Sequence, residues 1–163
     1  MNILAIDPGT TESGWCVYNP ETKTPVAYGV DKNEDVLELV YKRTDCELAI
    51  EMVACYGMPV GKTTFETCLW IGRFIQQFHD WSPNNITKVY RKDVKLHMCN
   101  SMRAKDTNIC QAICDRFGGT RKIAVGTKKK PGPLYGMAKH MWAAFAIAIT
   151  HAERINHANN ETI

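Results

Sequence analysis

Two acidic residues of this chain lie at or within short apolar runs, where a carboxylate needs a partner. Asp7 ends the apolar run at residues 3–6 and is followed by a tight turn at residues 8–10, and Glu51 lies in the segment ELAIEMV. A buried carboxylate is unfavourable unless a cation neutralises it. Divalent metal ions, or phosphates that carry them, are the usual partners of such hard oxygen ligands. The alternative for Glu51 is an acid that is satisfied at a sheet edge without a metal.

Hydrophobic periodicity and turn residues predict the elements that position these acids. Thr63 and Glu66 have the spacing of a capping box, which predicts that a helix begins there. The basic segment at residues 120–133 is rich in Gly and Pro and is expected to be a mobile surface loop. The pattern favours an α/β fold of one domain over residues 1–163, a mixed sheet with helices on both faces. The expected strands are residues 3–6, 15–18, 25–30, 47–53 and 86–90, and the expected helices are residues 33–42, 63–81, 94–98, 106–117 and 134–154.

The composition is that of an ordinary globular protein, with 45% hydrophobic and 23% charged residues among 163. No leader and no apolar stretch long enough to span a membrane is apparent, so we expect a cytoplasmic protein of a bacterial or phage-infected cell. The seven cysteines suit a reducing compartment. Cys110 and Cys114 share a predicted helix face near His97 and Cys99, but their spacing matches no standard zinc pattern.

Positive charge is concentrated in one part of the chain. Residues 86–139 carry thirteen Lys or Arg and three Asp, although the formal net charge of the whole chain is only +3. Basicity of this extent favours a polyanionic partner. The alternative is a basic face that is only solvated.

Five segments, in this order, resemble the RuvC family of Holliday-junction resolvases. They are AIDPGTTESGW, ELAIEMV, VYRKDVK, NSMRAKD and AFAIAITHAE. The resemblance implies an RNase H-like fold, with three antiparallel strands followed by parallel ones. It also implies a crossover junction endodeoxyribonuclease that hydrolyses phosphodiester bonds with two Mg²⁺ ions. Two ions about 3.5–4 Å apart neutralise the attacking and the leaving oxygen, and Mn²⁺ is expected to substitute where an imidazole ligates.

The resemblance assigns four positions to the catalytic site: Asp7, Glu51, His140 and Ala143. Asp7 would bridge the ions, Glu51 would ligate one, and His140 would ligate metal or position the attacking water. The family expects Asp at position 143, and alanine cannot ligate a metal. The chain is therefore an inactivated variant of a junction nuclease or a natural junction-binding module without cleavage. We prefer the first explanation because the other features are intact.

The resemblance also implies how branched DNA would be held. Tyr56 corresponds to an aromatic residue that stacks on bases, although a packing role is an equal alternative. Two-fold junction symmetry favours a C2 homodimer through residues 63–81, with Phe65, Leu69, Ile71 and Phe74 as an apolar stripe that could instead be core. The basic residues expected to contact DNA phosphates are Lys62, Lys92, Lys95, Arg103, Lys105, Lys128, Lys129 and Lys130.

Two ATP-binding classes fit the sequence less well. GMPVGKT is similar to a phosphate-binding P-loop, but Tyr56 occupies the position where the pattern requires Gly. The turn after Asp7 is also similar to the first phosphate loop of the sugar-kinase and actin superfamily. Those proteins need two such domains, and this chain is too short for two.

Overall fold

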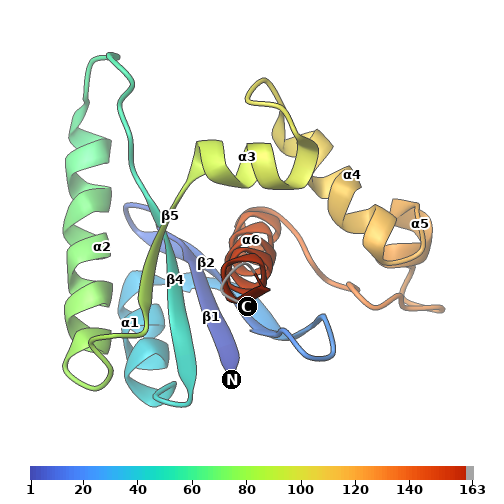
Figure 1. Ribbon diagram of the computed structural model, residues 1–163, viewed down its shortest axis with the longest axis horizontal. Coiled ribbons are helices and arrows are strands. Elements are labelled where there is room, and N and C mark those ends of the chain that lie inside the picture. The colour runs from blue at the N-terminus through green and yellow to red at the C-terminus, as the bar shows by residue number, and fades with distance from the viewer. Residues whose placement is uncertain (161–163) are drawn as a thin grey trace.

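The protein, described by a computed structural model for residues 1–160 and for the side chains of residues 1–154, is built on one five-stranded mixed sheet (Figure 1). The strand order is β3-β2-β1-β4-β5, with antiparallel β1–β2 and β2–β3 pairs and parallel β1–β4 and β4–β5 pairs. This arrangement confirms the predicted mixed sheet. The strands are β1 (Asn2–Asp7), β2 (Glu12–Asn19), β3 (Thr24–Lys32), β4 (Cys46–Met52) and β5 (Ile86–Tyr90).

Helices cover both faces of the sheet (Figure 1). Helices α1 and α2 lie on one face, and α6 packs on the other face, where it also contacts α3 and α4. Alternate residues of β1 serve the two cores: Ile3 and Ala5 pack on the α6 side, and Leu4 and Ile6 pack on the other. Because β1 is covered on both faces, its sequence is a continuous apolar run. The helices are α1 (Asn33–Lys42), α2 (Lys62–His79), α3 (Arg91–Cys99), α4 (Asp106–Arg116), α5 (Arg121–Ala124) and α6 (His140–Asn160).

The structure corrects three of the expected element boundaries. Helix α2 begins at Lys62 with Gly61 as its N-cap and no side-chain capping bond, so the predicted capping box is wrong. Helix α6 begins at His140 and not at residue 134, because the preceding residues turn through Gly136 at a φ of 90°. The expected loop at residues 120–133 contains the short helix α5 and a bridge between Gly126 and Pro131.

The apolar stripe proposed for dimerisation divides into two parts. Ile71 and Phe74 are 2% and 0% exposed and belong to the core between α2 and the sheet. Phe65 and Leu69 are 62% and 71% exposed. The first pair is therefore intramolecular core, and only the second pair is available to another molecule.

No helix among the described residues combines the length and the apolarity needed to cross a membrane.

Candidate active site

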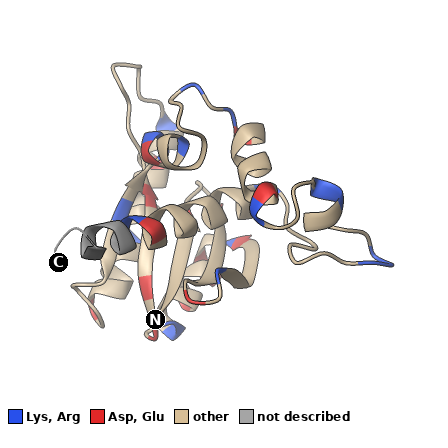
Figure 2. Cartoon of the chain, turned by 45° about the vertical axis from the view of Figure 1, so that its right-hand side comes forward, with Lys and Arg blue, Asp and Glu red and all other residues tan. Residues whose placement is uncertain are grey.

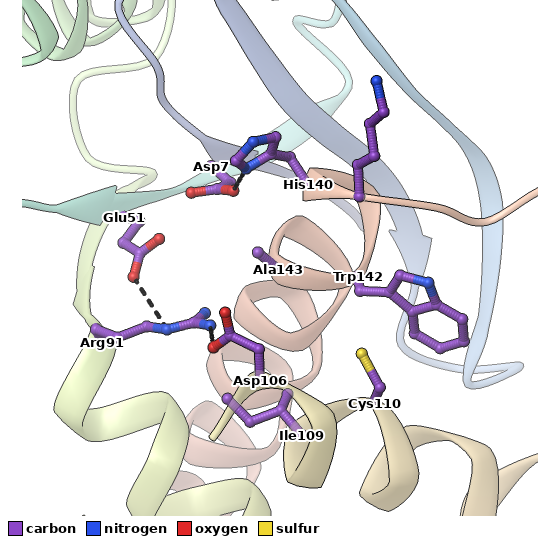
Figure 3. A pocket seen from close by; sticks show the side chains of 10 residues that line it. Asp7, Glu51, Arg91, Asp106, Ile109, Cys110, His140, Trp142 and Ala143 are labelled. Carbon is purple, nitrogen blue, oxygen red and sulfur yellow. Dashed lines mark hydrogen bonds and ion pairs between the residues drawn. The ribbon is translucent and has the colours of Figure 1, made fainter. Parts of the chain in front are cut away.

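A pocket of about 510 Å³ opens where β1 and β4 end and α6 begins (Figure 3). Three of the four predicted catalytic positions line it as polar residues, and the fourth, Ala143, contributes a methyl group. Residues separated by more than 130 positions in the sequence therefore meet in one place. The lining residues are Asp7, Glu51, Arg91, Asp106, Ile109, Cys110, Lys139, His140, Trp142 and Ala143.

Asp7 is the last residue of β1, and hydrogen bonds with Ser13 and Asn33 hold the turn that follows it. The Ser13 hydroxyl accepts from the Gly9 amide at 3.2 Å and donates to Asn33 Oδ1 at 2.6 Å. The Asn33 amide nitrogen donates to the Gly9 carbonyl at 3.0 Å. Ser13 and Asn33 are buried, so their hydrogen bonds replace those lost to water. This network holds the turn and hence the direction in which Asp7 leaves the sheet.

His140 is brought to Asp7 by a close approach of α6 to β2. His140 Nδ1 lies 2.8 Å from Asp7 Oδ2. Gly14 pairs with Asp7 across the β1–β2 ladder, and a Cβ at Gly14 would lie 2.5 Å from the His140 carbonyl oxygen and 2.6 Å from the His140 Cβ. Glycine is therefore required at position 14 for α6 to begin here.

Glu51 lies beside Asp7 because β4 runs parallel to β1, with Ile6 paired to Ile50. Burial, and after it the contact with Asp7, raise the pKa of Glu51 to about 8, although Arg91 opposes the shift. Two carboxylates held together away from water repel each other unless a cation or a proton joins them. The pair therefore has the chemistry of a cation site.

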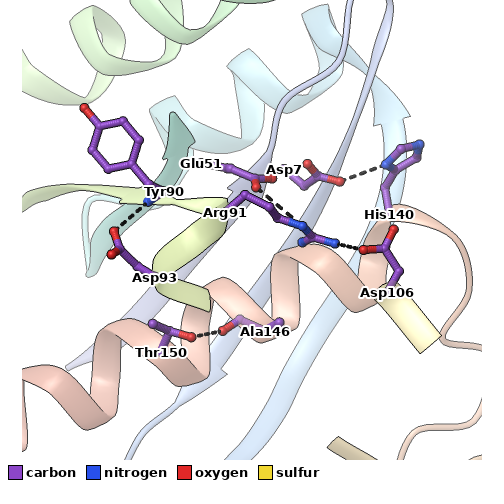
Figure 4. A network of polar contacts seen from close by, with 9 residues as sticks. All are labelled: Asp7, Glu51, Tyr90, Arg91, Asp93, Asp106, His140, Ala146 and Thr150. Atoms are coloured by element: carbon purple, nitrogen blue, oxygen red, sulfur yellow. Dashed lines mark hydrogen bonds and ion pairs between the residues drawn. The ribbon is translucent and has the colours of Figure 1, made fainter. Parts of the chain in front are cut away.

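Arg91 and Asp106 (Figure 4) line the pocket together with Lys139, and sequence reasoning assigned a site role to none of the three. Arg91 Nε lies 3.9 Å from Glu51 Oε1, and Arg91 Nη2 donates to Asp106 Oδ1. Burial alone would lower the pKa of Arg91, but the carboxylates of Glu51, Asp106 and Asp7 outweigh it and raise the pKa. Arg91 immediately follows β5, the parallel neighbour of β4, which was the one available signal for its position. Asp106 ends the quoted segment NSMRAKD, but the sequence does not show that the packing of α4 would bring it to this pocket.

The donor set fits one divalent ion better than two. Asp7 and Glu51 offer hard oxygen ligands and His140 offers an imidazole beside Asp7. Ala143 offers no ligand, and the Arg91 guanidinium lies next to Glu51. Among residues whose side chains are described, no group of three or more His, Cys, Asp or Glu already converges on a single point, and this includes the cysteines considered for zinc.

The residues expected to bind DNA lie in several places around the pocket. Tyr56 is 63% exposed in the loop after β4, with Lys92 Nζ 5.8 Å from its ring centroid, so the packing alternative for Tyr56 is wrong. Lys62 lies at the start of α2, and its Nζ is 3.5 Å from Glu66 Oε1. Lys92 and Lys95 lie on α3, and Arg103 and Lys105 precede α4.

The cluster formed by Lys128, Lys129 and Lys130 is exposed and separate from the other basic residues. It occupies the segment between α5 and α6, which extends away from the sheet (Figure 2). The structure therefore brings Tyr56 and Lys92 together but places this lysine cluster apart from them.

The five-stranded mixed sheet with helices on both faces is the RNase H-like fold that the sequence motifs implied. Among solved structures it is similar to Thermus thermophilus RuvC, with a TM-score of 0.68, 18% identity and 97% of each chain covered. It is also similar to T. thermophilus RuvC in complex with a Holliday-junction substrate, with a TM-score of 0.62, 16% identity and 96% of each chain covered. A Fowlpox virus resolvase in complex with Holliday-junction DNA gives a TM-score of 0.53 at 11% identity, over 95% of this chain and 99% of the other.

Comparison of the whole sequence with family models and with curated proteins does not find this similarity. No protein-family model matches the chain, and no curated protein matches it. At these identities the solved structures establish a shared fold, and this confirms the RuvC-like architecture that the five motifs predicted.

Proposed function

We propose that the chain is a structure-selective endonuclease of the junction-resolving type, which binds four-way and related branched DNA. One observation carries the proposal: the pocket gathers Asp7, Glu51 and His140, the three residues that the RuvC resemblance assigns to phosphodiester hydrolysis. It does so in a fold shared with two proteins that were solved bound to Holliday junctions.

The metal in this proposal is Mg²⁺, with Mn²⁺ as an effective substitute. Asp7 and Glu51 would hold it through carboxylate oxygens, and His140 would either add a third ligand or remain unligated and act on the attacking water. When bound, it would neutralise charge on the phosphate and lower the pKa of a bound water. The family chemistry uses two ions, and the absence of a ligand at position 143 weakens the site for the second.

The chain's own residues supply the proton transfer and the orientation. With a proton on Nδ1, His140 donates to Asp7 and leaves Nε2 free to accept a proton from the attacking water. Asp7 thereby fixes both the tautomer and the ring direction of His140. The exposed lysines and Arg103 would hold the DNA backbone through phosphate contacts, which are independent of base sequence.

A second candidate function is junction binding without cleavage. It is favoured by Ala143, which lines the pocket at a position where the resemblance expects a metal ligand. Both candidates require selective junction binding, and they differ in whether a carboxylate at position 143 restores cleavage.

A homodimer is part of the proposal because two symmetric nicks in a four-way junction need two active sites. Phe65 and Leu69 on α2 are the exposed apolar residues that support an interface on that helix.

A binding titration tests the substrate class. In EDTA, a synthetic four-way junction should bind at least about tenfold more tightly than a linear duplex of equal length and sequence content. The junction affinity should fall steeply with salt because several phosphates are contacted. Equal affinity for the two DNAs would contradict the proposal.

A further inference from the structure

The pocket holds an arginine whose hydrogen-bonding capacity is mostly unused. A guanidinium carries five N–H donors. Within the described part of the chain, Arg91 makes one side-chain hydrogen bond, from Nη2 to Asp106 Oδ1. Its Nε is 3.9 Å from Glu51 Oε1, beyond hydrogen-bond range, and Nη1 is the one buried side-chain nitrogen or oxygen without a partner.

We propose that Arg91 is a substrate-binding residue whose guanidinium binds a DNA phosphate next to the branch point, with Asp106 as its positioning residue. This inference rests on the proposed function and adds a residue that the motif resemblance did not assign. Arg91 lines the same pocket as Asp7 and Glu51, so a phosphate bound by it lies at the candidate catalytic centre (Figure 3).

The geometry favours an oxyanion as the missing acceptor. The planar fork of arginine matches two oxygens of one phosphate, which lysine cannot do. Because Nη1 has no partner, turning the guanidinium toward an incoming oxygen breaks no hydrogen bond of that atom. The ion pair with Asp106 holds the other side of the fork and limits how far it can turn.

The position in the fold brings DNA to this group. Arg91 begins α3 directly before Lys92, and Asp106 begins α4 directly after Lys105. Both neighbouring lysines are exposed. A backbone held by Lys92 and Lys105 therefore passes the mouth of the pocket between them.

The competing explanation is that Arg91 only neutralises the acids around it. A neutral pair, Arg91→Gln with Asp106→Asn, separates the two explanations because it removes the arginine and one of the acids together. If Arg91 only neutralises charge, the double variant should bind DNA like the wild type. If Arg91 binds phosphate, the double variant should be as weak as Arg91→Gln alone.

The experiment measures equilibrium binding of the full chain to a four-way junction in EDTA. Junctions carrying one neutral methylphosphonate at each phosphate flanking the branch point are compared with the unmodified junction. Arg43→Gln is the matched control, since Arg43 follows α1 near the start of β4, at the opposite end of the sheet from the pocket. Arg91→Lys keeps the charge without the fork and serves as the second variant if Arg91→Gln does not fold.

We expect Arg91→Gln to bind the unmodified junction about tenfold more weakly, as for the loss of one charge-assisted hydrogen bond. A methylphosphonate at one of the positions should weaken junction binding by the wild type and by Arg43→Gln about tenfold as well. The same methylphosphonate should cause no further loss of binding by Arg91→Gln or Arg91→Lys. Restored affinity in the double variant overturns the inference, as does equal sensitivity of all variants at every position. A wild type that does not prefer the junction overturns the proposed function as well, so the two failures are distinguishable.

Discussion

At the scale of single residues, the site differs from the expected one at three positions. Ala143 lies where the RuvC resemblance expects a carboxylate, and Arg91 and Asp106, which lie within two of the quoted motifs, form an ion pair to which the sequence analysis gave no role. The remaining acids, Asp7 and Glu51, stay close enough that burial and mutual repulsion keep the pKa of Glu51 near 8. Asp7, Glu51 and His140 therefore already line the pocket to which a carboxylate at position 143 would be added.

Ala143→Asp should strengthen divalent metal binding. One more carboxylate facing the pocket adds an attractive charge, and we expect Mn²⁺ affinity to rise by about tenfold or more. Electron paramagnetic resonance of free Mn²⁺ measures this without any DNA or turnover. Ala143→Asn, which has the same size without the charge, is the control and should leave the affinity near that of the wild type. Equal Mn²⁺ affinity in the Asp and Asn variants would contradict this role for position 143.

At the scale of elements, the site depends on how α6 is attached to the rest of the fold. Its first residue is fixed against Gly14 of β2. Further along, Glu153 joins α6 to the two helices above the pocket: it accepts from Arg116 of α4 and contacts His97 of α3. The closeness of Asp7 and Glu51 could be predicted, because both lie in apolar strand segments. These helix attachments could not, because they depend on tertiary packing that has no sequence period.

Gly14→Ala should separate His140 from Asp7. The new Cβ would overlap the His140 backbone, so the start of α6 must move, at a cost of about 1–3 kcal/mol in the free energy of unfolding. Denaturant unfolding measures this cost, and the NMR signals of the His140 ring nitrogens report the lost contact between Nδ1 and Asp7. Gly72→Ala is the control, because no atom lies within 4 Å of its added Cβ and α2 gains helix propensity there. Unchanged signals of the His140 ring nitrogens in Gly14→Ala would refute the positioning role.

Glu153→Gln should lower stability in a pH-dependent way. Burial tends to raise the pKa of Glu153, but hydrogen bonds from Arg116 and His97 outweigh it and lower the pKa. A carboxylate with a lowered pKa stabilises the fold above its unfolded pKa, and that stabilisation is lost as the pH falls through the folded pKa. The variant should therefore be about 1–3 kcal/mol less stable at neutral pH, with the difference vanishing in acid. Thermal unfolding from pH 7 to pH 3 measures this difference. Glu38→Gln is the control, because Glu38 forms an exposed ion pair with Lys42. A difference that is constant across this range would contradict it.

At the scale of the whole molecule, the sheet and α6 form the body, Lys92 and Lys105 lie next to the pocket residues Arg91 and Asp106, and Lys128, Lys129 and Lys130 lie apart in an extended segment (Figure 2). Through the RuvC resemblance, sequence reasoning predicted three antiparallel strands followed by parallel ones. Half of the expected dimer stripe proved to be core, since Ile71 and Phe74 pack between α2 and the sheet. The error arises because apolar residues lie on both the buried and the exposed side of α2, and periodicity alone does not show which of them the sheet covers.

Leu69→Glu should weaken self-association. Leu69 is 71% exposed on α2, and a charge there opposes burial against a second copy. Sedimentation equilibrium should show a shift from dimer to monomer. Ile123→Glu, at an exposed apolar residue of α5, is the control and should leave the dimer intact. A wild type that is monomeric at all concentrations would remove α2 as an interface.

DNA cleavage by Ala143→Asp tests whether the pocket is a junction nuclease site that lacks one carboxylate. Ala143→Asp is incubated with Mg²⁺ or Mn²⁺ and a four-way junction, a three-way junction or a linear duplex, beside the wild type and the double variant Asp7→Asn with Ala143→Asp. We expect Ala143→Asp to make paired symmetric nicks near the branch point and to leave the linear duplex intact. The wild type and the double variant should not cut. An Ala143→Asp protein that binds the junction but never cuts it with either metal would contradict the account and leave junction binding as the function.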